Sequence, residues 1–240
     1  MKHPQLVTPQ QLIDPIVWLR TACAKNGLTL QDDQLKLIGD YVRLLLEWNQ
    51  KINLISRRDE ENVWQSHILH SIAPLFQIKL PESCRIVDLG TGGGLPGIPL
   101  RILNPTIRMT MVDSTQKKIM AVNEMIKALG IKDTVAVWGR AEELSKRKEF
   151  KSQFDVVVAR GVGPLDELIR LSHPFLALSG PLAGSTEAPI GCLLAYKGGG
   201  LEQEIAKSEL NKTVREIKVR TLSGDGMDPA AGKKLVIVHF

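Results

Sequence analysis

A glycine-rich segment follows directly on a short apolar run that ends in an acid. Residues 86–97 read IVDLGTGGGLPG, so the acid is Asp88 and the alternating glycines are Gly90, Gly92 and Gly94. Glycine is needed where the backbone takes a positive φ or where a ligand lies against bare backbone, and a preceding strand makes such a motif informative. The pattern predicts a loop that binds a nucleotide cofactor.

Asp88 indicates which cofactor this is. A dinucleotide-binding fold normally has G-x-G-x-x-G and places a pyrophosphate on the following helix N-terminus, and the spacing here differs. A carboxylate in the mouth of the loop would repel a pyrophosphate, whereas it would attract the ammonium and sulfonium groups of S-adenosylmethionine. The sequence therefore favours a methyl donor over NAD.

A second acid, Asp113, follows the apolar run 107–112. Its separation from Asp88 is close to the spacing at which an acid meets ribose hydroxyls in doubly wound folds. The alternative is that Asp113 is the N-cap of a helix that begins near Thr115. The two roles are compatible, and both are kept open.

The apolar periodicity predicts the elements that position these residues. Helices are expected over 8–26, 32–49 and 60–75, and strands that alternate with helices over 86–89, 107–112, 135–138, 155–159 and 193–196. The runs 214–222 and 235–240 are joined by a Gly/Asp turn with no room for a helix, which predicts a closing antiparallel hairpin. We expect a Rossmann-like α/β fold with a mostly parallel seven-stranded sheet, divided into a helical N-terminal extension (1–80) and a cofactor-binding domain (81–240).

Polar residues that follow parallel strands are candidates for one cleft, because ligands lie beyond the carboxyl ends of such strands. They are Asp88 with residues 90–94, then Asp113 and Ser114, then residues 140–142, then Arg160 and Gly161, then residues 197–200. For each member alone the alternative is a helix cap or a surface charge.

The chain has a net charge of +5 and a pI near 9.1, which is weak evidence for a nucleic-acid partner. Basic residues cluster in the connection that holds Lys51, Arg57 and Arg58, and at 117–118, 146–148 and 233–234. A solvated face explains each cluster taken alone, because lysine and arginine are normally exposed. Only convergence of the clusters would make a footprint for phosphates.

Other features exclude several classes of protein. Prolines and glutamines at 4–11 interrupt any apolar region, so neither a signal peptide nor a membrane span is expected, and the protein should be cytoplasmic. Cys23, Cys84 and Cys192 are far apart, which predicts inert thiols. His67 and His70 lack a third ligand, so no metal is expected. The Gly/Pro/Ser-rich segment 179–191 is interpreted as a flexible insertion at the sheet edge away from the ligand.

Several strings together resemble one family. They are NLIS at 53–56, HILHSI at 67–72, DLGTGGGLPGIP at 88–99, DS at 113–114, GRAEE at 139–143, AR at 159–160 and KG at 197–198. They are similar to the ribosomal RNA small-subunit methyltransferase G family, also called glucose-inhibited division protein B. The resemblance implies a class I S-adenosylmethionine-dependent methyltransferase that acts on N7 of one guanine in bacterial 16S ribosomal RNA, with naked RNA or the small ribosomal subunit as the substrate. Separately, we expect the protein to be a monomer. It also implies that the cofactor is lined by Gly90, Leu95, Ala141, Glu142 and Arg160.

The chain departs from the family pattern away from the cofactor loop. The family commonly reads RHILDS where this chain has SHILHS, so Ser66 replaces an arginine and His70 replaces an aspartate. Lys233 stands at the family's basic position near the last strand. The segment 179–191 lengthens a connection that is usually short. These departures bear on RNA contacts more than on the chemistry.

Methyl transfer to guanine N7 needs little acid or base catalysis. Guanine N7 carries a lone pair and no proton, so methyl transfer to it requires alignment and no general base. Arg160 and Lys197 are therefore predicted to be the catalytic, positioning residues. The predicted cofactor-binding residues are Asp88, Gly90, Gly92, Gly94, Leu95, Asp113, Ser114, Ala141, Glu142 and Arg160. The predicted RNA-binding residues are Arg57, Arg58, Lys117, Arg140, Lys197 and Lys233.

Two other functions are compatible with parts of the sequence. A methyltransferase that acts on a small molecule or a protein would keep the glycine loop and transfer methyl without RNA. A non-catalytic RNA-binding or ribosome-assembly factor would keep the basic surface and transfer nothing.

Overall fold

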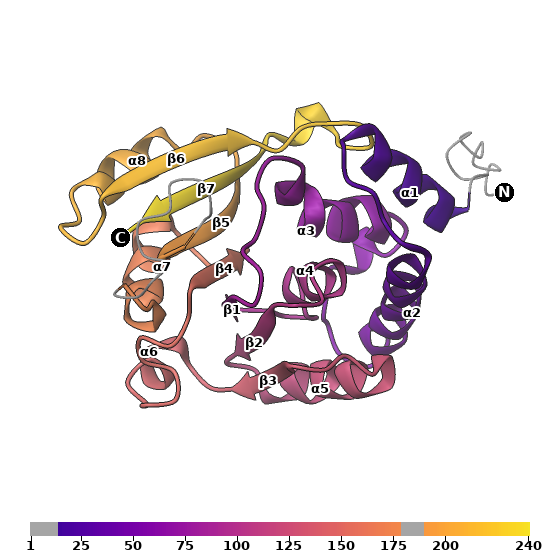
Figure 1. The fold of residues 1–240 in the computed structure, drawn as a ribbon, viewed down its shortest axis with the longest axis horizontal. Helices are drawn as coiled ribbons and strands as arrows, with labels where there is room; N and C mark the ends of the chain where they lie inside the picture. The colour runs from indigo at the N-terminus through magenta and orange to yellow at the C-terminus, as the bar shows by residue number, and fades with distance from the viewer. Residues whose placement is uncertain (1–13, 179–189) are drawn as a thin grey trace, which may run out of the picture.

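A computed structural model describes residues 14–178 and 190–240, and within them a seven-stranded sheet forms the centre of the protein (Figure 1). The strand order is β3-β2-β1-β4-β5-β7-β6, with bounds β1 Arg85–Leu89, β2 Arg108–Asp113, β3 Thr134–Trp138, β4 Val156–Arg160, β5 Cys192–Gly198, β6 Glu216–Thr221 and β7 Lys233–His239. β1 to β5 pair in parallel, and β7 pairs antiparallel with both β5 and β6. The expected α/β fold with a closing hairpin is confirmed.

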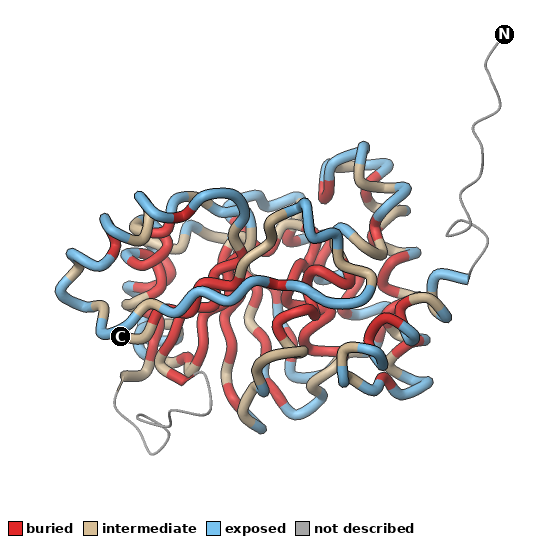
Figure 2. The backbone as a smooth tube through the Cα atoms, turned by 90° about the horizontal axis from the view of Figure 1, so that it is seen from above, coloured by how far each residue is buried: buried red, intermediate tan, exposed pale blue. Residues whose placement is uncertain are grey.

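Helices cover both faces of the sheet. On one face lie α1 Pro15–Lys25, α2 Asp32–Asn49, α4 Gly97–Leu103 and α5 Gln116–Leu129, and on the other lie α6 Ala141–Leu144, α7 Leu165–Ser172 and α8 Glu202–Glu209 (Figure 1). Two cores result, because the central strands are buried on both faces and alternate their side chains between them. Figure 2 shows these buried residues in the interior, with exposed residues on the outer helix surfaces.

The N-terminal helices share a core with the sheet. Leu19 of α1 and Leu45 of α2 belong to the same buried cluster as Ile86, Met111 and Val158 of the strands. The division at residue 80 stays a prediction. The part of the predicted first helix before residue 14, and residues 179–189 of the predicted insertion, lie outside the described residues.

The predicted helix over 60–75 is broken into three short pieces. A π-helical turn η3 (Trp64–Leu69) leads into α3 (His70–Ile72) and a 3-10 turn η4 (Ala73–Phe76). The carbonyl of His67 accepts from Ser71 Oγ at 2.6 Å and from Arg160 Nη1 at 3.3 Å, which draws it out of the regular helical ladder. Pro74 cannot donate a backbone hydrogen bond, so the α-helix does not continue past it. Single π-turns of this kind often occur at functional sites.

The connection between β6 and β7 is longer than a tight turn and packs against the N-terminal helices. It spans 222–232 and contains the 3-10 turn η6 (Pro229–Ala231). Gln65 Nε2 donates to the Gly226 carbonyl at 2.8 Å, and Asn26 Nδ2 donates to the Asp225 carbonyl at 3.0 Å. Gly224 has φ +145°, and a Cβ there would lie 2.0 Å from Asn26 Oδ1, so only glycine fits. The hairpin is thereby tied to α1 and η3.

The three cysteines are buried and form no disulfide. Burial raises the pKa of the Cys23 and Cys84 thiols to about 12, so both stay protonated and unreactive at neutral pH. In the part of the chain that the structure describes, no helix combines the length and the apolar character needed to cross a membrane.

Candidate active site

The glycine loop joins β1 to α4 at the carboxyl end of the sheet. Gly90, Gly92 and Gly94 have φ of +70°, +57° and +94°, which side chains rarely adopt. The backbone N–H groups of Gly90 and Thr91 donate to the Val112 carbonyl at 2.8 and 3.0 Å, so the loop is fixed to β2. A Cβ at Gly90 would lie 2.5 Å from Val162 Cγ2. The loop after β1 and the loop after β4 are therefore in contact at Gly90.

Asp88 lies beneath this loop and is fully buried. Its Oδ2 accepts from Thr91 Oγ1 at 2.6 Å and from the Gly97 N–H at 3.0 Å. Within the described residues, its Oδ1 is buried without a hydrogen-bond partner. Burial raises the pKa of Asp88 to about 6, although these two hydrogen bonds and the charge of Arg160 favour the carboxylate.

Asp113 connects the glycine loop to the turn that starts α5. Its Oδ2 accepts from the Gly92 N–H at 3.0 Å, and its Oδ1 accepts from the Thr115 N–H at 2.8 Å. The N-cap position of α5 is Thr115, so Asp113 shapes the turn before the cap and does not occupy the cap itself. The structure thus places Asp113 against the loop, while its contact with a ribose stays a prediction.

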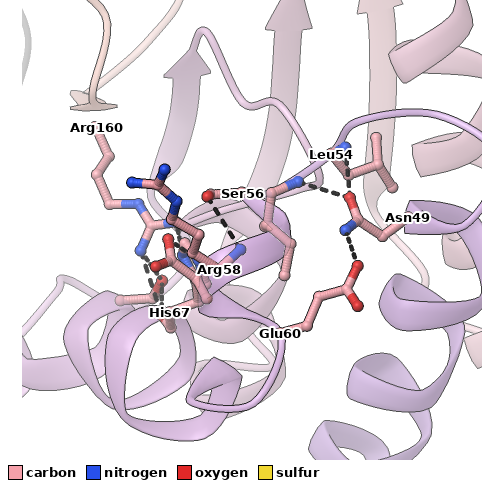
Figure 3. A network of polar contacts seen from close by, with 10 residues as sticks. Asn49, Leu54, Ser56, Arg58, Glu60, His67 and Arg160 are labelled. Carbon is pink, nitrogen blue, oxygen red and sulfur yellow. Dashed lines mark hydrogen bonds and ion pairs between the residues drawn. The ribbon is translucent and has the colours of Figure 1, made fainter.

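Arg160 ends β4 and is held by the broken helix (Figure 3). Its Nη2 lies 3.0 Å from His67 Nδ1, and its Nη1 donates to the His67 carbonyl and to Ser71 Oγ, both at 3.3 Å. Because a guanidinium only donates, Nδ1 must be the accepting nitrogen and the ring proton sits on Nε2. His67 Nε2 lies 3.2 Å from Asp59 Oδ2, although the two atoms are not aligned for a hydrogen bond.

Both histidines of this region are neutral at physiological pH. Burial, with the charge of Arg160, lowers the pKa of His67 to about 4, and the nearby Asp59 only partly offsets this. Burial lowers the pKa of His70 to about 3, again with a contribution from Arg160. His70 packs edge-on against Tyr196, whose hydroxyl donates to the Ser71 carbonyl at 2.7 Å. Neutral rings let Arg160 keep its positive charge without a competing cation.

A cavity of about 550 Å³ lies beside Arg160, between η3, the ends of β4 and β5, and the start of β7. Three of its lining residues are basic, namely Arg160, Lys197 and Lys233. Lys197 Nζ lies 2.6 Å from Glu204 Oε2 and donates to the Gly163 carbonyl at 2.9 Å, so its charge is partly neutralised. Asp59 and Asp228 also line the cavity, so cations and carboxylates share its wall.

A buried asparagine fixes the NLIS segment over the glycine loop. Asn49 Oδ1 accepts from the N–H groups of Leu54 and Ile55 at 2.8 and 2.9 Å, and its Nδ2 donates to Glu60 Oε1 at 2.6 Å (Figure 3). Leu54 then lies against the loop, where a Cβ at Gly93 would be 3.2 Å from Leu54 Cβ. The sequence carried a signal for Asn49, because this polar residue continues the apolar stripe of α2.

The other predicted site residues lie around this centre. Leu95 is buried in the loop, Ala141 and Glu142 begin α6, and Ser114 is exposed after β2. Lys117 and Arg140 are exposed at the carboxyl edge of the sheet, and Arg57 and Arg58 lie on the 3-10 turn η2 (Arg57–Asp59). The structure therefore brings the loops after the parallel strands β1 to β5 to one edge. Sequence reasoning missed Tyr41, whose hydroxyl donates to the Gly93 carbonyl at 2.9 Å, as well as Asn49, Asp59 and Trp138.

Comparison with known proteins identifies the family. The family model for rRNA small subunit methyltransferase G matches residues 34–226. This chain belongs to the rRNA small subunit methyltransferase G family. The Ribosomal RNA small subunit methyltransferase G of Pelodictyon phaeoclathratiforme is 39% identical over 96% of each chain, and that of Chlorobium limicola is 43% identical over 76% of each. The expected family is confirmed, and with it the prediction of an S-adenosylmethionine-dependent rRNA methyltransferase.

Solved structures share the fold at low sequence identity. The chain is similar to M. jannaschii TYW2, solved in complex with AdoMet, with a TM-score of 0.51, 14% identity and coverage of 79% of this chain and 77% of that one. It is also similar to a predicted O-methyltransferase from Agrobacterium tumefaciens, with a TM-score of 0.50, 16% identity and coverage of 71% and 78%. In the described residues, no group of three or more His, Cys, Asp or Glu side chains is placed to hold a metal ion.

Proposed function

We propose that this protein transfers the methyl group of S-adenosylmethionine to N7 of a guanine in 16S ribosomal RNA, in the cytoplasm and as a monomer. The main support for this function is the position of Arg160. Arg160 is the last residue of β4, the strand that pairs with β1 below the glycine loop, and it also lines the cavity. It therefore joins the predicted cofactor side of the site to a space that suits a nucleotide. Membership of the family supports the class of reaction, and the position of Arg160 between the loop and the cavity supports where in the protein the reaction takes place.

The residues present fit the cofactor. Asp88 Oδ1 is a buried acceptor with no partner among the described residues, and the loop offers bare backbone at Gly90, Gly92 and Gly94. When bound, S-adenosylmethionine supplies an electrophilic methyl group on a sulfonium. The residues that would hold it are the loop with Leu95, then Asp113 and Ser114 after β2, then Ala141 and Glu142 after β3, together with Arg160.

Arg160 orients the base and does not move a proton. A guanidinium has five N–H donors, and the three contacts to His67 and Ser71 use three of them, which leaves two. A donor of this kind matches the guanine edge that presents O6 beside N7. His67 keeps the guanidinium in place, and Asp59 lies on the far side of the ring. No general base is needed, because N7 carries no proton.

The remaining basic residues are proposed to hold phosphates of the RNA. Lys233 lines the cavity, Arg57 and Arg58 flank it through η2, and Lys117 and Arg140 lie along the sheet edge. Contacts to phosphates position an RNA without reading its sequence. Lys197 also lines the cavity, but its pairing with Glu204 reduces the positive charge that it offers to the RNA.

The test is transfer of labelled methyl from S-adenosylmethionine to small ribosomal subunits and to protein-free 16S RNA from cells that lack this modification. Modified guanines are mapped by chemical cleavage of the strand at N7-methylguanine. We expect label at a single guanine. Transfer to small molecules or proteins without RNA, or cofactor binding with no transfer at all, contradicts the proposal.

A further inference from the structure

Trp138 is an exposed aromatic residue that the reaction centre does not use. It is the last residue of β3 and 55% of it is exposed, whereas Trp18, Trp48 and Trp64 pack against the core. Its Nε1 donates to the Ser114 carbonyl at 3.0 Å, which fixes the orientation of the ring. A large aromatic surface held rigid in water is typical of an interaction site.

Met120 extends the apolar surface beside Trp138. Asn123 of α5 forms two hydrogen bonds with the backbone of Ala136 in β3, at 2.9 and 3.2 Å, so this turn of the helix lies against that point of the strand. Met120 precedes Asn123 by one turn, and Trp138 follows Ala136 by two residues on the same face. Met120 is 60% exposed. Both residues therefore lie toward the carboxyl end of the contact between α5 and β3.

The surroundings of this pair are basic. Lys117 lies one turn before Met120, and Arg140 follows Trp138 by two residues. Among the described residues, no carboxylate lies within 4 Å of the charged nitrogens of either residue, whereas the nearby Glu142 pairs with Arg170 at 3.9 Å. Glu124 is one turn further from the edge. An apolar aromatic surface between unpaired cations is complementary to an unpaired nucleotide, which has a flat base and a phosphate.

We propose that Trp138, Met120, Lys117 and Arg140, which we name the edge platform, bind an unpaired nucleotide of the RNA substrate outside the reaction centre. The base stacks on Trp138 and Met120, and the cations contact its phosphates. This inference rests on the proposed rRNA substrate. The platform is distinct from the cofactor site, because Trp138 points to the same strand face as the buried Ala136, toward α5, and away from the α6 face.

The test measures the Kd of the purified protein for protein-free, unmodified 16S RNA and for small ribosomal subunits, in parallel with the Kd for S-adenosylmethionine. The variants are Trp138→Ala, Trp138→Phe and Leu210→Ala. Leu210 is a matched control, because it is 83% exposed and lies at the end of α8, far along the chain from the platform. Thermal unfolding of each variant confirms that the fold is retained.

Stacking on an aromatic side chain changes affinity by about 5- to 150-fold per base, so Trp138→Ala should raise the Kd for RNA by a factor in that range. Trp138→Phe and Leu210→Ala should stay within about threefold of wild type, since phenylalanine keeps a stacking surface. The Kd for S-adenosylmethionine should stay within about threefold of wild type, since Trp138 contacts Ser114 only at its backbone carbonyl. Lys117→Ala should lower the dependence of log Kd on log salt by about one unit of slope.

Three results would overturn the edge platform. They are an unchanged Kd for RNA in Trp138→Ala, a loss confined to S-adenosylmethionine, and an effect seen with small ribosomal subunits but not with naked RNA, which would indicate a protein partner. The readout is binding, so it does not depend on catalysis. If the wild-type protein binds RNA through Trp138 but transfers no methyl, the proposed function fails while the platform stands.

Discussion

The glycine loop and the Arg160 cavity lie side by side, yet they are built in different ways. The loop is held by its own backbone, through positive φ at Gly90 and Gly92 and hydrogen bonds to two acids, Asp88 and Asp113. The cavity is held by side chains from distant segments, and Arg160 reaches His67 across 93 residues of sequence. Neighbouring strand ends thus fix most of the loop, which is the proposed cofactor half of the site, and Tyr41 of α2 adds support. The cavity, which is the proposed RNA half, depends on η3 being docked against β4.

The largest effect on methyl transfer is expected for Arg160, which lies between the glycine loop and the cavity. Arg160→Ala removes the donor that we propose contacts the base, and loss of one such donor typically costs about 100- to 1,000-fold in rate. Single-turnover methyl transfer to rRNA measures it, with thermal unfolding to confirm the fold. Arg160→Lys keeps the positive charge but loses the planar array of N–H donors, so its rate of methyl transfer should remain well below that of wild type. Wild-type rates in Arg160→Ala would refute the assignment of this residue.

The loop can be tested with two glycines that share a backbone conformation but differ in their surroundings. Gly90→Ala places a Cβ 2.5 Å from Val162 Cγ2, whereas at Gly161, with φ +69° close to the +70° of Gly90, no described atom lies within 4 Å of the added carbon. Both variants carry backbone strain of roughly 1–2 kcal/mol. Only Gly90→Ala should also weaken S-adenosylmethionine binding, by about tenfold or more, which is about 1.4 kcal/mol.

Isothermal titration of both glycine variants with S-adenosylmethionine gives the measurement. Equal Kd values for the two variants would show that contact at Gly90 does not shape the loop. The cofactor half would then depend on backbone conformation alone.

Asn49 tests whether the N-terminal helices support the loop. Asn49→Ala leaves the N–H groups of Leu54 and Ile55 without an acceptor, and each unsatisfied buried donor costs about 1–3 kcal/mol. We expect a lower melting temperature and a few-fold weaker S-adenosylmethionine binding. Asn123→Ala is the control, because it also breaks two backbone hydrogen bonds but does so at β3. If both variants weaken S-adenosylmethionine binding equally, the NLIS segment at 53–56 does not specifically support the glycine loop.

The smallest effect concerns pH. His67 has a pKa lowered to about 4 from 6.5, so the folded state takes up its proton at lower pH than the unfolded state. The stability that this group contributes is therefore present above pH 6.5 and is lost as the pH falls toward 4. Complete titration of one proton gives at most about 1.4 kcal/mol per pH unit.

His67→Gln keeps an acceptor for Arg160 and removes the titration. The free energy of unfolding, measured with urea between pH 6.5 and 4, should fall less steeply with decreasing pH in His67→Gln than in wild type. Asp88, whose pKa is raised to about 6, has the opposite dependence, but it cancels in this difference. Parallel curves for the two proteins would show that His67 is not the titrating group.

The sequence predicted the fold and the cofactor half because both depend on local patterns. Alternating strands and helices, the glycine spacing and the acids at strand ends all lie within short segments. The sheet confirms the alternation, whereas the cofactor contacts of the loop and the acids stay predictions. The three-piece helix was not predicted, because the carbonyl of His67 turns outward to a residue of β4. The pairing of Lys197 with Glu204 was also invisible, since it depends on how α8 packs against β5.

Asn123 has a second consequence beyond placing Met120. β3 is an edge strand, and at Ala136 the side-chain amide of Asn123 occupies the backbone donor and acceptor that a neighbouring strand would otherwise pair. Exposed strand edges invite pairing with other chains and aggregation. The opposite edge, β6, instead carries charged residues, Lys218 and Arg220. One edge of the sheet is thus covered at Ala136 by a side-chain amide and the other carries charge, two different features that both disfavour the addition of a further strand.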